Sequence, residues 1–384
     1  MQGIFPFSIT RARVLCALFL LALAAPGIGH LFSISSEATI AEFEYRDAAP
    51  LPKWPHSVAQ WNEAPRLVDN YLKDRFGFRR QLIDTHQYII RQLGIRPGDA
   101  KAVIGRDGWL FLADTDVVES YLGRKPFRSN EAAAWLNAAQ NIQAQVARRG
   151  GEFTVLITPQ KASIYGEFLP DYLNVAPTPS RASVLENAAS TYGLSFLNAI
   201  PRLLSAKDSG QLFYKTDTHW NALGAYEGYL ALMAQLRAQG IEPEILDTTR
   251  LQKSTTEGYS GDLARFFSNS DRYTEDAPGL SVDNPTSLTL NENLEGYDYD
   301  AFTGYIMEAT ALDRPSVLIV GDSFTGLLLP YLRESFSRVV FIHHEFGAFN
   351  RAILDEYTFD VVVLQMAERM LLEPLSQTED GAKP

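Results

Sequence analysis

Cysteine and histidine are both scarce in this chain of 384 residues. The single cysteine, Cys16, lies in an apolar N-terminal stretch. A lone thiol excludes a disulfide within the chain and a metal site built from several cysteines. Of the six histidines, only His219, His343 and His344 fall near the ends of predicted elements in the main part of the sequence. A histidine that carries chemistry is therefore to be sought among these three.

Positive charge is also in short supply. The chain has 34 Lys and Arg against 46 Asp and Glu, with a net charge of −12 and a pI near 5.1. This balance argues against nucleic acid as the partner, because phosphate binding needs clustered basic residues. Internal repeats and low-complexity tracts are absent from the sequence. The 46% hydrophobic and 21% charged fractions are those of an ordinary globular protein.

The N-terminus has the pattern of a targeting segment. Arg11 and Arg13 precede residues 14–32, which are apolar apart from His30. A helix needs about 20 residues to span a bilayer, and positive charges before it hold its start in the cytoplasm. Residues 1–34 are therefore predicted to be a signal anchor in the inner membrane, with the rest of the chain in the periplasm. A cleaved signal peptide is the alternative, since Leu23-Ala24-Ala25 offers small residues to a peptidase.

The remaining chain is predicted to be an α/β domain over residues 65–375, between a proline-containing linker at 35–64 and a tail at 376–384. One helix or two, broken near Gly77, are expected within residues 66–93, and a hairpin over 103–112. Strands separated by helices indicate a doubly wound, mostly parallel sheet. Residues 245–312 are polar and are expected to be an irregular insertion. The expected strands are 153–157, 194–200, 317–320, 339–342 and 361–364, and the expected helices are 182–191, 221–239, 324–334 and one ending at Gly150-Gly151.

Ser323 follows one of these strands through Gly321-Asp322 and precedes a predicted helix. Ligands bind beyond the carboxyl ends of strands in parallel α/β sheets, so this serine is placed where a nucleophile is expected. The backbone amides of Ser323 and Phe324 are candidate donors to an oxyanion. The alternative is that Ser323 only caps the helix.

Asp217 and His219 supply the other two parts of a serine acyl-transfer site. Residues two apart in an extended loop point the same way, so the carboxylate of Asp217 can orient the imidazole of His219. Capping of the following helix by Asp217, beside a hydrogen-bonded histidine, is an equal alternative. Trp220, next in the chain, is a candidate substrate contact or a packing residue.

A metal site is the competing interpretation of Asp-x-His followed by Gly-Asp, the first two blocks of metallophosphoesterases. The further Gly-Asn-His block is missing from this sequence. His343 and His344 are adjacent, and adjacent strand residues point to opposite faces. No metal and no cofactor are therefore expected.

Several short motifs recur together in this order: Asp74-x-Phe76-Gly77-Phe78-Arg79, Gly105-x-Asp107-Gly108-Trp109, Pro159-x-Lys161-x-x-x-Tyr165, Tyr214-x-x-Asp217-x-His219-Trp220-Asn221, Gly261-Asp262-Leu263, Gly321-Asp322-Ser323-Phe324 and Glu368-Arg369. With these motifs the chain resembles the alginate O-acetyltransferase-like proteins of the SGNH-hydrolase-like superfamily, which acetylate exported polysaccharides in the periplasm. The resemblance runs over most of residues 60–370.

This resemblance implies a triad of Asp217, His219 and Ser323, in a motif order permuted relative to ordinary SGNH hydrolases, where the serine comes first. It also implies a polysaccharide acceptor, and a multi-pass membrane acyltransferase that delivers the acetyl group. A carbohydrate esterase, and a non-catalytic component of a polysaccharide-modifying complex, remain alternatives. The candidate substrate-binding residues are Lys161, Tyr165, Trp220, Glu368 and Arg369; Trp109, Tyr297 and Tyr299 are further aromatic residues able to stack on sugar rings.

Overall fold

The computed structural model describes residues 9–31, 49–78, 101–113, 115–128, 130–173, 179–267, 270–287, 289–299, 302–308, 313–344 and 348–378, with Leu82, Thr85 and Ile89. Two compact units divide the chain. One contains residues 1–97 and 265–272, and the other contains residues 98–264 and 273–384.

Helix α1 (Ile9–Leu31) and helix α3 (Val58–Asp74) belong to the first unit. Across the described ranges, no helix is long and apolar enough to cross a membrane. The membrane anchor predicted at residues 1–34 is therefore not confirmed.

The predicted linker is wrong over its last residues, because α3 begins at Val58. The side chain of Ser57 caps this helix by accepting from the amide of Gln60. Pro65 lies inside the helix, although proline was expected to keep this stretch extended. The helix predicted from residue 66 ends at Asp74, just before the suggested break at Gly77, and most of residues 79–100 lie outside the described residues.

The second unit is built on one large sheet, as the alternation of strands and helices predicted. In the described part, seven strands lie in the order β4-β3-β12-β9-β10-β8-β7. The first five are parallel, and β8 and β7 add an antiparallel hairpin at one edge. Their bounds are β4 Phe196–Asn198, β3 Glu152–Thr158, β12 Val361–Ala367, β9 Ser316–Gly321, β10 Arg338–His343, β8 Phe302–Glu308 and β7 Thr289–Tyr299.

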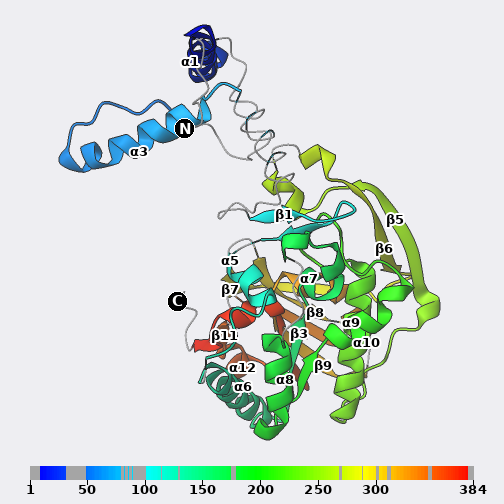
Figure 1. The fold of residues 1–384 in the computed structure, drawn as a ribbon. Helices are drawn as coiled ribbons and strands as arrows, with labels where there is room; N and C mark the ends of the chain where they lie inside the picture. The colour runs from blue at the N-terminus through cyan, green and yellow to red at the C-terminus, as the bar shows by residue number, and fades with distance from the viewer. Residues whose placement is uncertain are drawn as a thin grey trace, which may run out of the picture. The chain divides into compact units, whose positions relative to one another are not determined.

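Two hydrophobic clusters cover the two faces of this sheet. Side chains alternate along β3, so that Val155 joins one cluster and Leu156 the other. Helices α6 (Glu131–Ala147), α8 (Arg181–Ala189) and α12 (Ile353–Glu356) pack on one face, and α9 (Ile200–Ala206) and α10 (Ala222–Ala238) on the other (Figure 1). Burial on both faces explains why the parallel strands have near-continuous apolar sequences.

Residues 245–312 are not the irregular insertion that their polarity suggested. They form a hairpin of β5 (Leu251–Tyr259) and β6 (Glu275–Val282), followed by β7 and β8. Strand β5 is exposed along nearly its whole length, so its side chains are polar on both faces and lack a period of two. The predicted tail also begins as a strand, β13 (Ser376–Thr378), which pairs with β11 (Ala348–Asn350).

The hairpin predicted over 103–112 is confirmed as β1 (Ala102–Ile104) and β2 (Leu110–Leu112). The helix predicted over 324–334 is replaced by a short 3-10 helix at Ser323–Leu327 and a single turn, α11 (Leu329–Leu332). Pro330 explains this interruption, because its ring tolerates only the first turn of a helix.

Three neighbouring strands, β3, β12 and β9, end at the same edge of the sheet. Gln160 and Lys161 follow β3, Ser323 follows β9, and Arg369 follows β12. Parallel strands deliver their carboxyl ends to one edge, so residues far apart in sequence meet there.

Candidate active site

The turn after β9 presents Ser323 without using its hydroxyl as a cap. Asp322 is the capping residue, because its Oδ1 accepts from the amide of Phe324 at 3.0 Å. The other oxygen of Asp322 accepts from the amide of Ala367 at 2.6 Å, which ties the turn to the end of β12. The alternative in which Ser323 merely caps the helix is therefore wrong.

Neither Asp217 nor His219 caps the helix α10 that follows them. Asn221 caps α10, accepting from the amides of Leu223 and Gly224 at 3.0 and 3.1 Å. An isolated bridge between Phe213 and Trp220 closes the base of the loop. Asp217 is thus available to the imidazole rather than to the helix.

Three side chains form a continuous hydrogen-bonded chain between these two segments. Nε2 of His219 lies 2.7 Å from Oγ of Ser323, and Nδ1 of His219 lies 2.7 Å from Oδ1 of Asp217. An ionised carboxylate can only accept, so Nδ1 carries the proton toward Asp217. In the neutral ring Nε2 is then the acceptor that faces the serine hydroxyl. This is the geometry of a general base poised on a nucleophile.

The carboxylate of Asp217 is buried and surrounded by donors. Its Oδ1 also accepts from the amide of His219 at 3.0 Å, and its Oδ2 accepts from the hydroxyl of Tyr259 at 2.9 Å and the amide of Asp262 at 3.1 Å. Burial alone would raise the pKa of Asp217, but the hydrogen bonds and charge of His219 outweigh it and hold that pKa well below its usual range. Asp217 therefore stays ionised while it orients His219.

Neighbouring residues hold the loop by bonds to two other carboxylates. Oε1 of Glu275 accepts from both the amide and the hydroxyl of Thr216 at 2.9 Å. Oδ1 of Asp262 accepts from the amide of Thr218 at 2.6 Å and from its hydroxyl at 3.1 Å. The residues on both sides of Asp217 are thus fixed independently of the histidine.

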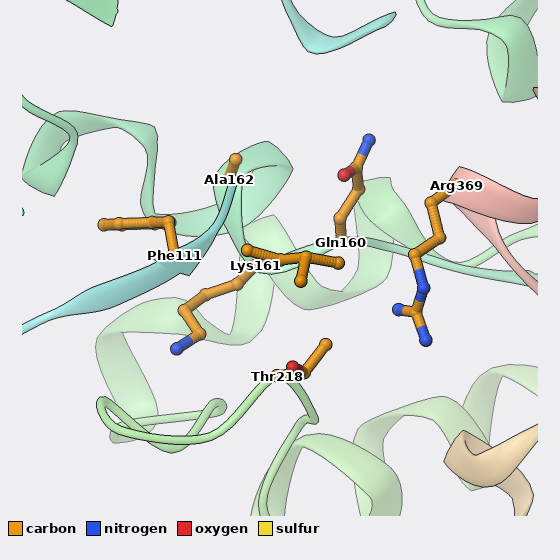
Figure 2. A pocket seen from close by; sticks show the side chains of 7 residues that line it. Phe111, Gln160, Lys161, Ala162, Thr218 and Arg369 are labelled. Atoms are coloured by element: carbon orange, nitrogen blue, oxygen red, sulfur yellow. The ribbon is translucent and has the colours of Figure 1, made fainter. Parts of the chain in front are cut away.

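A pocket lies beside this loop, at the carboxyl ends of β3 and β12. It is lined by Phe111, Leu112, Gln160, Lys161, Ala162, Thr218 and Arg369. Figure 2 shows the guanidinium of Arg369 pointing toward the part of the pocket where Thr218 lies. The ammonium of Lys161 points away from Arg369. Cζ of Arg369 also lies 5.4 Å from the ring centroid of Phe324, the residue after Ser323. Arg369 is therefore the cation that faces the space next to the loop.

The ammonium of Lys161 is occupied inside the protein. It donates to the carbonyl oxygens of Leu110 at 2.6 Å and Lys215 at 2.9 Å. Burial lowers the pKa of Lys161 to about 7, although the negative charge of Asp217 opposes the shift. Lys161 joins the β1–β2 hairpin to the chain two residues before Asp217.

Three of the predicted substrate contacts, like Lys161, have buried side chains that are already bonded within the protein, which argues against direct contact with a substrate. Trp220 is fully buried, and its Nε1 donates to the carbonyl of Phe324 at 3.1 Å. Tyr165 stacks on Trp109, which is itself buried, and accepts from the amide of Leu212 at 2.9 Å. Glu368 accepts from the hydroxyl of Ser163 at 2.6 Å and the amide of Gln160 at 3.3 Å, and burial raises its pKa. The side chains of Tyr297 and Tyr299 lie outside the description.

The oxyanion donors also differ from the sequence prediction. The amide of Phe324 is engaged by Asp322, so it is not available to a substrate. The amide of Ser323 is left as the candidate backbone donor of this turn.

Within the described part of the chain, Asp217, His219 and Asp262 form the cluster that could hold a metal ion, since one ligand atom of each lies within 4.8 Å of the others. The carboxylate oxygens of this cluster accept hydrogen bonds, which favours a hydrogen-bonded site over a metal site. Both oxygens of Asp217 accept from N–H or O–H donors, and Oδ1 of Asp262 accepts from Thr218.

Sequence reasoning missed Tyr259, Glu275 and the role of Asp262. The segment Gly258-Tyr259-Ser260-Gly261-Asp262 carries the available signal. A Cβ on Gly261 would lie 2.4 Å from Cβ of Asp217, so two glycines around a tyrosine mark a place where the backbone approaches the site.

Comparison with known proteins places this architecture in a family. Residues 102–358 match the family described as an SGNH hydrolase-like domain, acetyltransferase AlgX. The chain is 31% identical over 178 residues to the probable alginate O-acetylase AlgJ of Pseudomonas aeruginosa, covering 45% of this chain and 41% of that protein. It is 29% identical over 175 residues to the corresponding protein of Pseudomonas syringae pv. tomato, covering 45% and 42%.

A solved structure shares the fold. Bacillus cereus PatB1 with a sulfonyl adduct superposes with a TM-score of 0.53 at 13% identity, over 72% of this chain and 99% of that one. The chain spans about two fifths of the curated relatives that it matches. Because the family match extends over more than half of the sequence, the chain belongs to the SGNH hydrolase-like acetyltransferase family of AlgX.

Proposed function

We propose that this protein is an O-acetyltransferase that moves acetyl groups onto hydroxyls of an exported polysaccharide through an acyl-Ser323 intermediate. The observation that carries the proposal is the hydrogen-bonded chain from Ser323 through His219 to Asp217, with both side-chain contacts at 2.7 Å. Membership of the AlgX family supports acetyl as the group transferred.

The first half of the reaction acylates the serine. Nε2 of His219 takes the proton of the Ser323 hydroxyl as Oγ attacks the acetyl carbonyl of the donor. The negative charge on the carbonyl oxygen is stabilised by the amide of Ser323 and, from the pocket, by the guanidinium of Arg369. The tetrahedral intermediate collapses, the donor's leaving group receives the proton from His219, and acetyl-Ser323 remains.

The second half returns the enzyme to its starting state. A sugar hydroxyl gives its proton to His219 and attacks acetyl-Ser323. Collapse of the second tetrahedral intermediate releases the O-acetylated sugar, and His219 returns the proton to Oγ of Ser323. Asp217 stays ionised and stabilises the imidazolium that forms in each half.

A carbohydrate acetylesterase is the second candidate, because water can replace the sugar hydroxyl at the same acyl-enzyme. A non-catalytic component of a modification complex is the third. The two enzymes differ only in which hydroxyl reaches acetyl-Ser323, so acceptor addition distinguishes them.

The test uses the full chain with a chromogenic acetyl ester, with and without oligosaccharide acceptors. We expect acetylated sugar by mass spectrometry, and loss of activity in Ser323→Ala, His219→Ala and Asp217→Ala. Ser281→Ala, a substitution of an exposed serine on β6, is the matched control and should keep full activity. Acetate release that no acceptor diverts would favour the esterase, and activity that survives all three substitutions would reject the mechanism.

The cellular setting forms part of this proposal. Residues 1–34 are proposed to export the protein to the periplasm, as an inner-membrane anchor or as a cleaved signal. A multi-pass membrane acyltransferase is proposed as the acetyl donor. Cell fractionation with N-terminal sequencing of the mature protein tests the first point, and co-purification from detergent-solubilised membranes tests the second.

A further inference from the structure

We propose that Tyr259 is a positioning residue for acyl transfer: its hydroxyl fixes the carboxylate of Asp217, which holds His219 against Ser323. The inference rests on the proposed function and adds a residue from β5, outside the three catalytic side chains. It assigns a role to the hairpin β5–β6 in the reaction.

The two oxygens of Asp217 are divided between two sets of donors. Oδ1 faces Nδ1 and the backbone amide of His219, at 2.7 and 3.0 Å. Oδ2 faces the Tyr259 hydroxyl at 2.9 Å and the amide of Asp262 at 3.1 Å. Rotation of the carboxylate would break bonds at both oxygens together. The pair on Oδ2 therefore determines where Oδ1 meets the imidazole.

The aromatic ring of Tyr259 is held in turn by the loop that it supports. It stacks on Tyr214, with ring centroids 4.6 Å apart and an interplanar angle of 26°. The amide of Tyr214 donates to the carbonyl of His219, so the stacking partner belongs to the same loop as the base. Gly258, at φ +65°, makes the irregular turn in β5 that brings Tyr259 to this position.

The chemistry of the contact suits a permanent donor. Burial, with the nearby negative charge of Asp217, raises the pKa of Tyr259 above its ordinary value, so the phenol keeps its proton. A hydrogen bond from a neutral phenol draws negative charge toward Oδ2. Its removal leaves Asp217 a stronger acceptor for the protonated imidazole, while the carboxylate becomes less well oriented.

The experiment compares Tyr259→Phe with Tyr214→Phe in the full chain, measuring kcat, KM and the pH profile with the chromogenic acetyl ester. Tyr214→Phe removes a hydroxyl from the other ring of the same stack, one that makes no hydrogen bond to Asp217. For Tyr259→Phe we expect kcat to fall about tenfold with KM little changed, as for a lost hydrogen bond to a charged group. The acidic limb of the profile should move to higher pH by about half a unit. Tyr214→Phe should resemble the wild type in both respects.

Melting temperatures of both variants separate positioning from folding. If Tyr259→Phe matches Tyr214→Phe in kcat per folded molecule and in its pH profile, Tyr259 has only a structural role and the inference is overturned. That result would leave the proposed function standing, provided that the wild type is active and Ser323→Ala is not. An inactive wild type, or an active Ser323→Ala, would instead reject the proposed function.

Discussion

Replacing Gly261 by alanine should disable the site without unfolding the protein. A Cβ at this position would lie 2.4 Å from Cβ of Asp217 and 2.6 Å from its Cα and its amide nitrogen. Carbon atoms in ordinary contact are about 3.5–4.0 Å apart, so one backbone must move by about 1 Å. Rotation of a side chain cannot relieve the clash, because two of the three atoms belong to the main chain of Asp217.

The surrounding bonds decide what this movement costs. Thr216 is fixed to Glu275 and Thr218 to Asp262, so a shift of the loop strains contacts on both sides of Asp217. Overpacking of this kind costs about 1–3 kcal/mol, which is a fraction of the roughly 5–15 kcal/mol that stabilises a typical domain. A displacement of about 1 Å at catalytic groups can cost roughly a hundredfold in rate. Activity should therefore fall about a hundredfold in a protein that remains folded.

The measurement is kcat/KM for the chromogenic acetyl ester together with urea denaturation. Gly326→Ala is the matched control: it lies in the short helix that begins at Ser323, and a Cβ there meets nothing within 4 Å. Gly326→Ala should change neither quantity appreciably. Should Gly261→Ala keep activity within threefold of Gly326→Ala, the loop tolerates displacement and the argument from close approach fails.

Three further substitutions test the site and its support. Burial lowers the pKa of Lys161 from 10.5 to about 7. Between these two pH values the unfolded chain binds a proton at Lys161 that the folded chain lacks. The free energy of unfolding should therefore rise with pH across this window. Lys161→Met should remove that part of the rise in urea titrations, and an unchanged pH dependence would contradict the burial of the ammonium. Arg369→Met should lower kcat/KM by roughly tenfold or more with melting temperature preserved, since the guanidinium faces the pocket; an unaltered rate would remove it from the mechanism. Trp220→Ala should cost about 3–5 kcal/mol in urea denaturation, whereas Trp54→Ala, at a residue that is 73% exposed, should cost under about 1 kcal/mol.

The parallel sheet was predictable because its strands are buried on both faces. Strand β12 is buried at every residue, and such a sequence has few alternatives to a central strand. The hairpin β5–β6 was not predictable, since most of β5 is exposed and its polar sequence is typical of a loop. Exposure removes the apolar periodicity on which strand prediction depends. The structure nevertheless uses this hairpin to deliver Tyr259 and Glu275 to the site.

The same physical limit explains which site residues were found. Asp217, His219 and Ser323 could be proposed because histidine is scarce in the chain, Asp217 lies two residues from His219, and Ser323 directly follows a recognisable strand. Residue type alone left Trp220 either a substrate contact or a packing residue, and packing distances favour the second: a Cβ on Gly228 would lie 2.7 Å from the Trp220 ring, so no space is left for a sugar there.

Among the carboxylates near the site, Asp217, Asp322 and Glu275 differ in which donors they accept from, and this explains why Asp217 contacts the imidazole of His219. Both oxygens of Asp322 accept from backbone amides, and Glu275 accepts from Thr216 and from the side-chain Nε2 of Gln211, so neither carboxylate is free to turn toward an imidazole. Asp217 is the carboxylate whose donors leave one oxygen directed at His219. Its hydrogen-bond donors fix this direction in the absence of substrate, as the proposed mechanism requires of a carboxylate that contributes to catalysis. That condition is imposed by Tyr259 and Asp262, residues that follow Asp217 in the chain by 42 and 45 positions. The proposed base, His219, is thus oriented by tertiary contacts, and we expect its orientation to be lost before the fold when the hairpin β5–β6 is perturbed.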